Sequence, residues 1–71
     1  MYASIHDLPF VCRLNLPEPA LQVYRNAFNR AWRLARAGKT RFRVAQHVAW
    51  TAVRRQFERD AHGRWRRRGA Q

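Results

Sequence analysis

The segment PEPALQVYRNAFNRAWRLARA, residues 17–37, decides the fold that the sequence predicts. Apolar residues recur in it at steps of three and four, the period that lines one face of an α-helix. Because Pro is tolerated in the first helical turn and Gly commonly follows the last, we predict a helix from Pro17 to Ala37 ended by Gly38. We interpret its apolar stripe as core, which leaves the opposite, arginine-bearing face for a partner. The stripe consists of Leu21, Tyr24, Ala27, Phe28, Ala31, Trp32 and Ala35.

Two further helices are predicted on either side of this one. Asp7-Leu8-Pro9 and Asn15-Leu16-Pro17 both resemble helix starts, so a short helix is expected over Leu8 to Leu14. After a turn at residues 38–40, a longer helix is expected from Arg41 to Asp60. Within it, Arg54 and Glu58 stand four residues apart, a spacing at which surface ion pairs form. The core-facing positions of this helix are Phe42, Ala45, Val48, Ala49, Ala52, Val53 and Phe57, with Trp50 at the margin.

The predicted fold class is mainly α: one small three-helix domain spanning residues 1–71, with residues 66–71 as a basic tail. His62-Gly63 is expected to end the last helix. A short extended pairing between the tail and residues 1–5 would add a two- or three-stranded sheet formed by the N- and C-terminal segments, and a tail without regular structure is the other option. The predicted core consists of large side chains: Tyr24, Phe28, Trp32, Val48, Trp50, Val53, Phe57 and Trp65.

The charge balance points to an acidic partner. Fifteen basic residues face four acidic ones, for a formal net charge of +11. All but Lys39 of the basic residues are arginine, which donates bidentately to phosphate and stacks on bases. A codon bias would explain the arginine preference equally well, but it would not explain why acids are scarce. Because such an excess repels itself in the folded state, we favour a polyanionic partner.

Catalysis and metal binding find little support in the sequence. Ser4 is the only serine and lies near the start of the chain, and no glycine-rich phosphate loop is present. The candidate metal ligands Cys12, His6, His47 and His62 lack the short spacings of structural zinc sites. We therefore predict no enzyme activity, no metal, no cofactor and no small-molecule substrate.

Cysteine content and hydropathy bear on the compartment. Cys12 is the only cysteine, so it can form no internal disulfide, and we expect a buried thiol in a reducing cytoplasm. No apolar run approaches the 18 residues of a membrane-spanning helix. A cytoplasmic localisation is the expectation.

Several motifs together resemble the ChaB family. The similarity extends from Asp7 to Trp65, and its most specific parts are the segments Ala27-Phe28-Asn29 with Ala31-Trp32 and Val48-Ala49-Trp50 with Ala52-Val53. The resemblance also rests on Asp7-Leu8-Pro9, Leu16-Pro17, Tyr24, His47 and Gly63. It implies about three helices with a small sheet and no enzyme activity.

The resemblance implies a function less firmly than a fold. The family takes its name from a protein assigned by inference to the regulation of a bacterial sodium or calcium/proton antiporter. Viral relatives exist for which DNA binding has been proposed, and others are fused to nucleic-acid-related domains. This chain departs from the family pattern because the segment between Trp32 and His47 is short and lacks an acidic stretch. That departure argues against a contribution of an acidic loop to cation sensing, and it favours nucleic-acid binding.

The main functional prediction is therefore binding of nucleic acid, without sequence specificity, through arginine-rich helix faces. The alternative is a regulatory module that meets an acidic protein such as an antiporter surface, or anionic lipid. A module whose charge mainly prevents self-association is the third option. The residues expected to contact a partner are Arg25, Arg33, Arg36, Arg43, Arg54, Arg55, Arg64, Arg66, Arg67 and Arg68.

Overall fold

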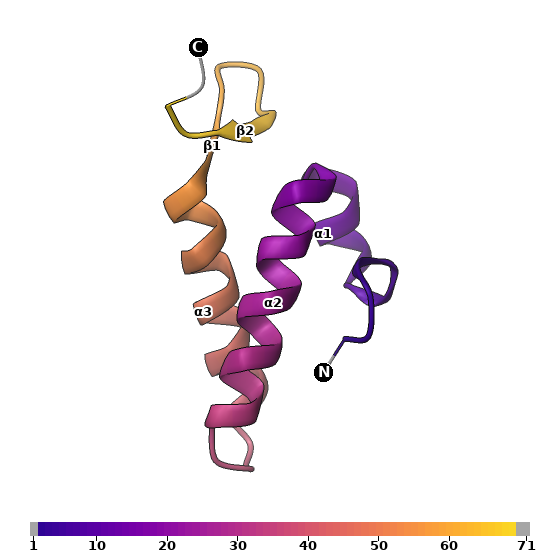
Figure 1. The fold of residues 1–71 in the computed structure, drawn as a ribbon, viewed down its shortest axis with the longest axis vertical. Helices are drawn as coiled ribbons and strands as arrows, with labels where there is room; N and C mark the ends of the chain where they lie inside the picture. Colours follow the sequence, from indigo (N-terminus) through magenta and orange to yellow (C-terminus); the bar gives the residue numbers. More distant parts are fainter. Residues whose placement is uncertain (1, 70–71) are drawn as a thin grey trace.

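The computed structural model describes residues 2–69. Its elements follow in the order η1 (Ile5–Asp7, a 3-10 turn), α1 (Phe10–Asn15), α2 (Glu18–Leu34), α3 (Arg41–Gln56), β1 (Phe57–Arg59) and β2 (Trp65–Arg67). Figure 1 shows α2 at the centre, with α3 along one side and η1 and α1 on the other. The two strands form an antiparallel hairpin beyond the C-terminal end of α3. The fold is thus mainly α with one small sheet, which confirms the predicted class.

The start of α2 follows from its prolines. Pro17 occupies the N-cap position and Pro19 lies in the first turn, where a missing N–H costs no helical hydrogen bond. The carboxylate of Glu18 in the same turn is stabilised by the positive end of the helix dipole. From here the helix buries one face, with Ala20, Leu21, Tyr24 and Phe28.

The end of α2 is set by a contact from α3. The helix stops at Leu34 rather than at the predicted Ala37, and Ala35 is extended with φ −79° and ψ 148°. Arg41 Nε and Nη2 donate to the Trp32 carbonyl oxygen at 2.9 and 2.6 Å. The guanidinium carbon also lies 4.2 Å from the centre of the Trp32 ring. Because Arg41 satisfies a carbonyl at the end of α2, the chain can leave the helix before Gly38.

We expect Arg41→Ala to lower the free energy of unfolding by about 1.5–3 kcal/mol, the range for hydrogen bonds to charged groups. Arg41→Lys should recover only part of this loss, because an ammonium cannot donate as a fork and stack on the indole as well. Arg43→Ala, at an exposed position of the same helix turn, is the matched control and should change stability by less than about 0.5 kcal/mol. Urea denaturation measures all three. Equal unfolding midpoints for Arg41→Ala and Arg43→Ala would contradict the assigned role.

α3 is shorter than predicted, ending at Gln56 rather than Asp60. Phe57 is extended, with φ −131° and ψ 155°, and opens β1. The strands pair Phe57 with Arg67, Glu58 with Arg66, and Arg59 with Trp65. The turn between them is organised by Asp60, whose Oδ1 accepts from the N–H groups of His62 at 2.8 Å and Arg64 at 2.9 Å. Asp60 therefore builds a hairpin turn where a helix end was expected.

The Asp60 turn should be sensitive to acid. The Arg64 N–H, followed by the His62 N–H and the charges of Arg66 and Arg64, lowers the pKa of Asp60 below its usual range. A carboxylate with a depressed pKa stabilises the fold above its unfolded value of about 3.9, and this contribution is lost as pH falls through the folded value. We expect the NMR shift of the Arg64 amide to titrate with a midpoint below about 3.9 in wild type. Asp60→Asn, which keeps an acceptor oxygen, should abolish that titration. A midpoint at or above the unfolded value would contradict the assignment.

The N-terminal segment packs on α2 and does not join a sheet within residues 2–69, so the predicted pairing of the two chain ends is wrong for these residues. Its part at Met1 lies outside the described residues. The side chain of Asn29 replaces a strand neighbour: its Oδ1 accepts from the Tyr2 N–H at 2.9 Å, and its Nδ2 donates to the Tyr2 carbonyl at 2.7 Å. Asp7, predicted to cap a helix beginning at Leu8, instead forms a capping box with Ser4 around η1, and α1 begins at Phe10.

The core lies between α2, α3 and the N-terminal segment. Of the predicted core residues, Tyr24, Phe28, Val53 and Phe57 are buried, while Trp32, Trp50 and Trp65 pack against them half-buried. The prediction that Val48 belongs to the core is wrong, because 40% of its surface is exposed. Ala27 and Ala31 of α2 share an open groove with it and are too short to cover it. Among the residues whose burial the structure describes, the other buried side chains are Ile5, Leu8, Cys12, Leu16, Ala20, Leu21, Ala45 and Ala49.

Candidate partner-binding surface

The hairpin end of the molecule gathers most of the arginines predicted to meet a partner. The last turn of α3 and the hairpin adjoin each other at this end (Figure 1). All six arginines are exposed: Arg54, Arg55, Arg64, Arg66, Arg67 and Arg68. Two acids, Glu58 and Asp60, lie in the same region. Arginines that the sequence places on a helix and on a tail thus gather at one end of the molecule, and we call this group the hairpin-end surface.

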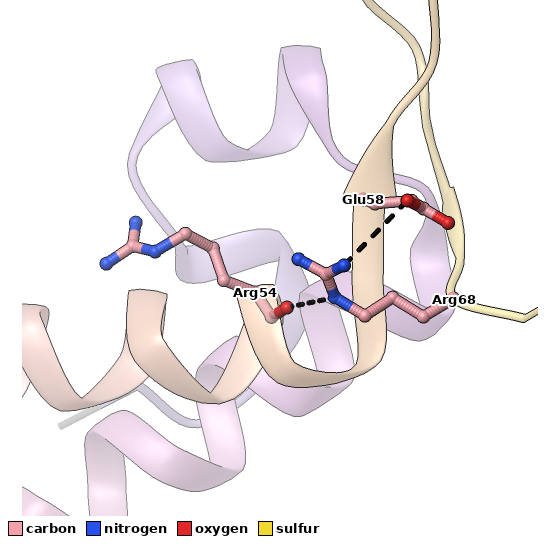
Figure 2. Close-up of polar contacts among 3 residues, drawn as sticks. All are labelled: Arg54, Glu58 and Arg68. Carbon is pink, nitrogen blue, oxygen red and sulfur yellow. Dashed lines mark hydrogen bonds and ion pairs between the residues drawn. The ribbon is translucent and has the colours of Figure 1, made fainter.

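Two of these arginines are engaged within the fold. Arg68 donates from Nε to the carbonyl oxygen of Arg54, and its Nη1 lies 3.8 Å from Glu58 Oε2, as Figure 2 shows. The expected Arg54–Glu58 helical pair is therefore wrong, since Glu58 belongs to β1 and pairs with Arg68 while the Arg54 guanidinium points away (Figure 2). Arg67 lies over the Phe57 ring, 4.9 Å from its centre. The side chains that remain for a partner here are Arg54, Arg55, Arg64 and Arg66.

The opposite end of the molecule carries a second basic group. α2 and α3 are joined at the far end from the hairpin (Figure 1), and the principal extent of the molecule is 41 Å. Arg33, Arg36, Lys39 and Arg43 flank this turn and are exposed. We call them the turn-end surface. The ten predicted arginines therefore do not form one continuous stripe along a helix.

Arg25 is the predicted partner-binding residue that the structure removes from both surfaces. Its side chain is half-buried, and Nη1 donates to the carbonyl oxygen of Ala3 at 3.4 Å. Arg25 Nε is buried and makes no hydrogen bond within residues 2–69. The N-terminal segment covers this position. Helical periodicity predicted an open face because it does not take other segments into account. Arg25 holds the N-terminal segment on α2.

The turn-end surface has no acidic neighbour in sequence. Residues 19–57 contain no Asp or Glu, while they hold nine Arg and Lys side chains. No internal carboxylate can neutralise Arg33, Arg36 or Arg43 from within this stretch. An acidic partner would relieve the resulting repulsion, and its approach would be faster at low ionic strength.

The interior offers no activated nucleophile at Cys12. The thiol is buried, and burial raises its pKa, although a hydrogen bond from the Tyr24 hydroxyl opposes this shift. Burial raises the pKa of Tyr24 as well. A protonated, enclosed thiol is a poor nucleophile. Within residues 2–69, no three His, Cys, Asp or Glu side chains converge as a metal site would require.

Sequence reasoning missed two features of the surface. The sequence predicted no role for Arg41, although its guanidinium donates two hydrogen bonds to the Trp32 carbonyl oxygen. The exposed apolar residues of the groove between α2 and α3 were also missed, because their periodicity matches that of core residues. The helices within residues 2–69 include none that is long and apolar enough to span a bilayer.

Comparison with known proteins places the chain in a family. The family model described as ChaB matches residues 8–68. The Escherichia coli K12 protein named "Putative cation transport regulator ChaB" is 30% identical over 73 residues, covering 94% of this chain and 96% of that protein. The Shigella flexneri protein of the same name matches to the same extent. A structure described as "NMR solution structure of the putative cation transport regulator ChaB" has a TM-score of 0.82 at 29% identity, covering 97% of this chain and 100% of the other. This chain belongs to the ChaB family.

Proposed function

We propose that this protein is a non-enzymatic, cytoplasmic regulatory module that binds an acidic surface of a cation transport protein, with a cation/proton antiporter as the family-implied target. The names of its relatives support regulation of cation transport. They support this function better than nucleic-acid binding, the function that charge alone favours. The arginine surfaces supply the chemistry: exposed guanidinium groups that can pair with carboxylates on a partner.

The observation that carries the proposal is the absence of acids from residues 19–57 together with exposed cations at both ends of the molecule. A domain that folds alone gains nothing from this arrangement, since like charges destabilise the compact state. Acidic loops of a transport protein would offset the repulsion. Exposed ion pairs contribute about 0.2–1 kcal/mol each, so several contacts are needed for useful affinity.

The test is capture of partners from a detergent extract of cell membranes by the immobilised full chain, with and without nuclease. We expect a cation transport protein to be recovered in both conditions and to elute between about 50 and 300 mM salt, where screening removes exposed ion pairs. A variant carrying Arg33→Glu and Arg36→Glu should recover less of the transport protein, because both exposed cations belong to the turn-end surface. Recovery that disappears after nuclease treatment would contradict the regulatory proposal.

Nucleic-acid binding is the second candidate, favoured by one observation. Nearly all the cations are arginine, and nine of the ten arginines predicted to bind are exposed. Fluorescence anisotropy with labelled duplex DNA and single-stranded RNA measures it. Phosphate contacts would make the logarithm of the binding constant fall with the logarithm of salt concentration, by about 0.9 per duplex phosphate neutralised. Absence of binding at 50 mM salt would leave the acidic protein partner as the target.

A further inference from the structure

An open groove separates α2 from α3 on one side of the helix pair. It encloses about 700 Å³. Its apolar lining comes from α2, from Ala35 directly after α2, and from α3: Val23, Ala27, Ala31, Leu34, Ala35, Val44, Val48 and Ala52. This groove is independent of the buried core between the same helices, where Tyr24, Phe28 and Val53 lie.

The groove exposes apolar surface that the fold leaves uncovered. Leu34 is 77% exposed, Val44 45% and Val48 40%. Val44, Val48 and Ala52 follow one another at four-residue steps on α3, and Ala27 and Ala31 do so on α2. Such rows form a ridge on each wall, and the alanines keep the floor low. From residue 44 to residue 56 the α3 wall is about 18 Å long at 1.5 Å per residue, enough for roughly three turns of a second helix.

The polar residues at the groove are cationic or neutral. Arg30 of α2 lines it directly. An adjoining hollow shares Val48 and Ala52 with the groove and adds Arg55 and His47 from α3. Both walls belong to residues 19–57, which contain no acid. The groove therefore combines an apolar lining with positive charge contributed by both helices.

We propose that this groove binds an amphipathic, acidic helix of a partner protein, with its apolar stripe on Val44, Val48 and Ala52 and its carboxylates at Arg30 and Arg55. This inference rests on the regulatory function proposed above and specifies the part of the partner that the domain recognises. Helices dock in grooves of this kind through apolar residues repeated at three- and four-residue steps. Charge complementarity selects the acidic partner and gives its orientation.

Other occupants fit the groove less well. A second copy of this chain would bring together two molecules of formal charge +11, with Arg30 and Arg55 of each at the interface. Nucleic acid would pair with the arginines but would leave the apolar lining of alanine and valine without an apolar ligand. An amphipathic acidic helix would contact both the apolar lining and the arginines.

The test uses a synthetic 18-residue peptide with leucines on one helical face and glutamates on both flanks, titrated into the full ¹⁵N-labelled chain. Two control peptides carry lysine in place of glutamate, or the same composition in scrambled order. We expect the acidic peptide to shift the amides of Val44, Val48 and Ala52, and to bind at least tenfold more tightly than either control. No shift in these amides, or equal binding of the scrambled peptide, would overturn the proposal.

Two variants distinguish groove binding from general attraction to charge. Val48→Asp places a carboxylate in the exposed apolar lining of the groove, and Leu14→Asp makes the same charge change on α1, where Leu14 is 69% exposed and outside the groove. We expect the first to weaken the acidic peptide at least tenfold and the second to change its affinity by less than about threefold. Circular dichroism confirms that both variants fold. Equal weakening by both variants would overturn the groove as the site.

The outcomes separate this proposal from the regulatory function itself. If Val48→Asp still captures a cation transport protein as wild type does, the groove proposal fails while the regulatory function stands. If wild type binds the acidic peptide but captures no transport protein, the regulatory function fails while the groove stands as a helix-binding site. A dimer in sedimentation that dissociates in Val48→Asp would assign the groove to a second copy and overturn the proposal.

Discussion

Phe28→Ala is expected to remove most of the stability of the domain at 25 °C. Phe28 is 1% exposed on the buried face of α2. Its ring centre lies 4.8 Å from that of Tyr2, 6.2 Å from that of Tyr24, 5.9 Å from that of Trp32 and 5.5 Å from that of Phe42. It therefore joins α2, α3 and the N-terminal segment, and its loss opens a cavity among all three. Such truncations cost about 3–5 kcal/mol, while the stability of a chain this small lies near the lower end of about 5–15 kcal/mol.

Thermal denaturation followed by far-ultraviolet circular dichroism and tryptophan fluorescence measures the effect. Phe10→Ala removes the same ring from an exposed position of α1 and should change stability by less than about 0.5 kcal/mol. Phe28→Leu, which keeps an apolar side chain in the same place, should retain a cooperative transition at reduced temperature. A Phe28→Ala variant that unfolds cooperatively within a few degrees of wild type would show that the ring does not hold the elements together.

The central helix could be predicted because its signals are local. Pro17 and Pro19 mark the start of α2, and the three- and four-residue steps from Leu21 to Phe28 define its buried face. Its end could not be predicted in the same way. Arg41, seven residues after Leu34, takes the Trp32 carbonyl and releases the chain at Ala35. A contact across a turn decided this boundary, and no local pattern encodes it.

The hairpin shows where periodicity is ambiguous. Phe57 continues the apolar period of α3 as well as it opens a short strand, so helix and strand could not be separated on pattern alone. Asp60 and Gly63 carried the turn signal, since Asp accepts backbone hydrogen bonds and Gly63 adopts φ +80°. The same ambiguity misplaced Glu58, which pairs with Arg68 across the hairpin and not with Arg54 along a helix.

The partner surface could be predicted in composition but not in arrangement. A helical wheel places Arg25 on an outer face and Val48 on a core-facing one, but it does not show which other elements lie against these faces. Arg25 is covered by the N-terminal segment through Ala3, whereas Val48 is uncovered because Ala27 and Ala31 are short. Both outcomes depend on other elements: the position of the N-terminal segment in the first case and the short side chains of α2 in the second. Burial is therefore a property of the packed pair, and one helix alone does not determine it.

Reversing the charge of the turn-end arginines is expected to weaken the binding of an acidic partner about a hundredfold. Arg33, Arg36 and Arg43 are exposed and make no hydrogen bond or ion pair within the part of the chain that the structure describes, so Arg→Glu changes at all three should leave the fold intact. Loss of three exposed ion pairs at about 0.2–1 kcal/mol each, with like-charge repulsion of similar size in their place, amounts to roughly 3 kcal/mol. Affinity for a polyglutamate peptide at 50 mM salt, measured by calorimetry, tests this expectation.

Arg→Lys changes at the same three positions separate charge from guanidinium geometry. Lysine keeps the positive charge but cannot form the bidentate fork that phosphate and carboxylate groups accept. For a carboxylate-rich protein surface met by long-range attraction, we expect the triple lysine variant to bind polyglutamate within about threefold of wild type. If the triple Glu variant binds as tightly as wild type, the partner does not contact the turn end. If lysine and glutamate variants lose affinity equally, geometry outweighs charge, and the regulatory proposal loses its electrostatic basis.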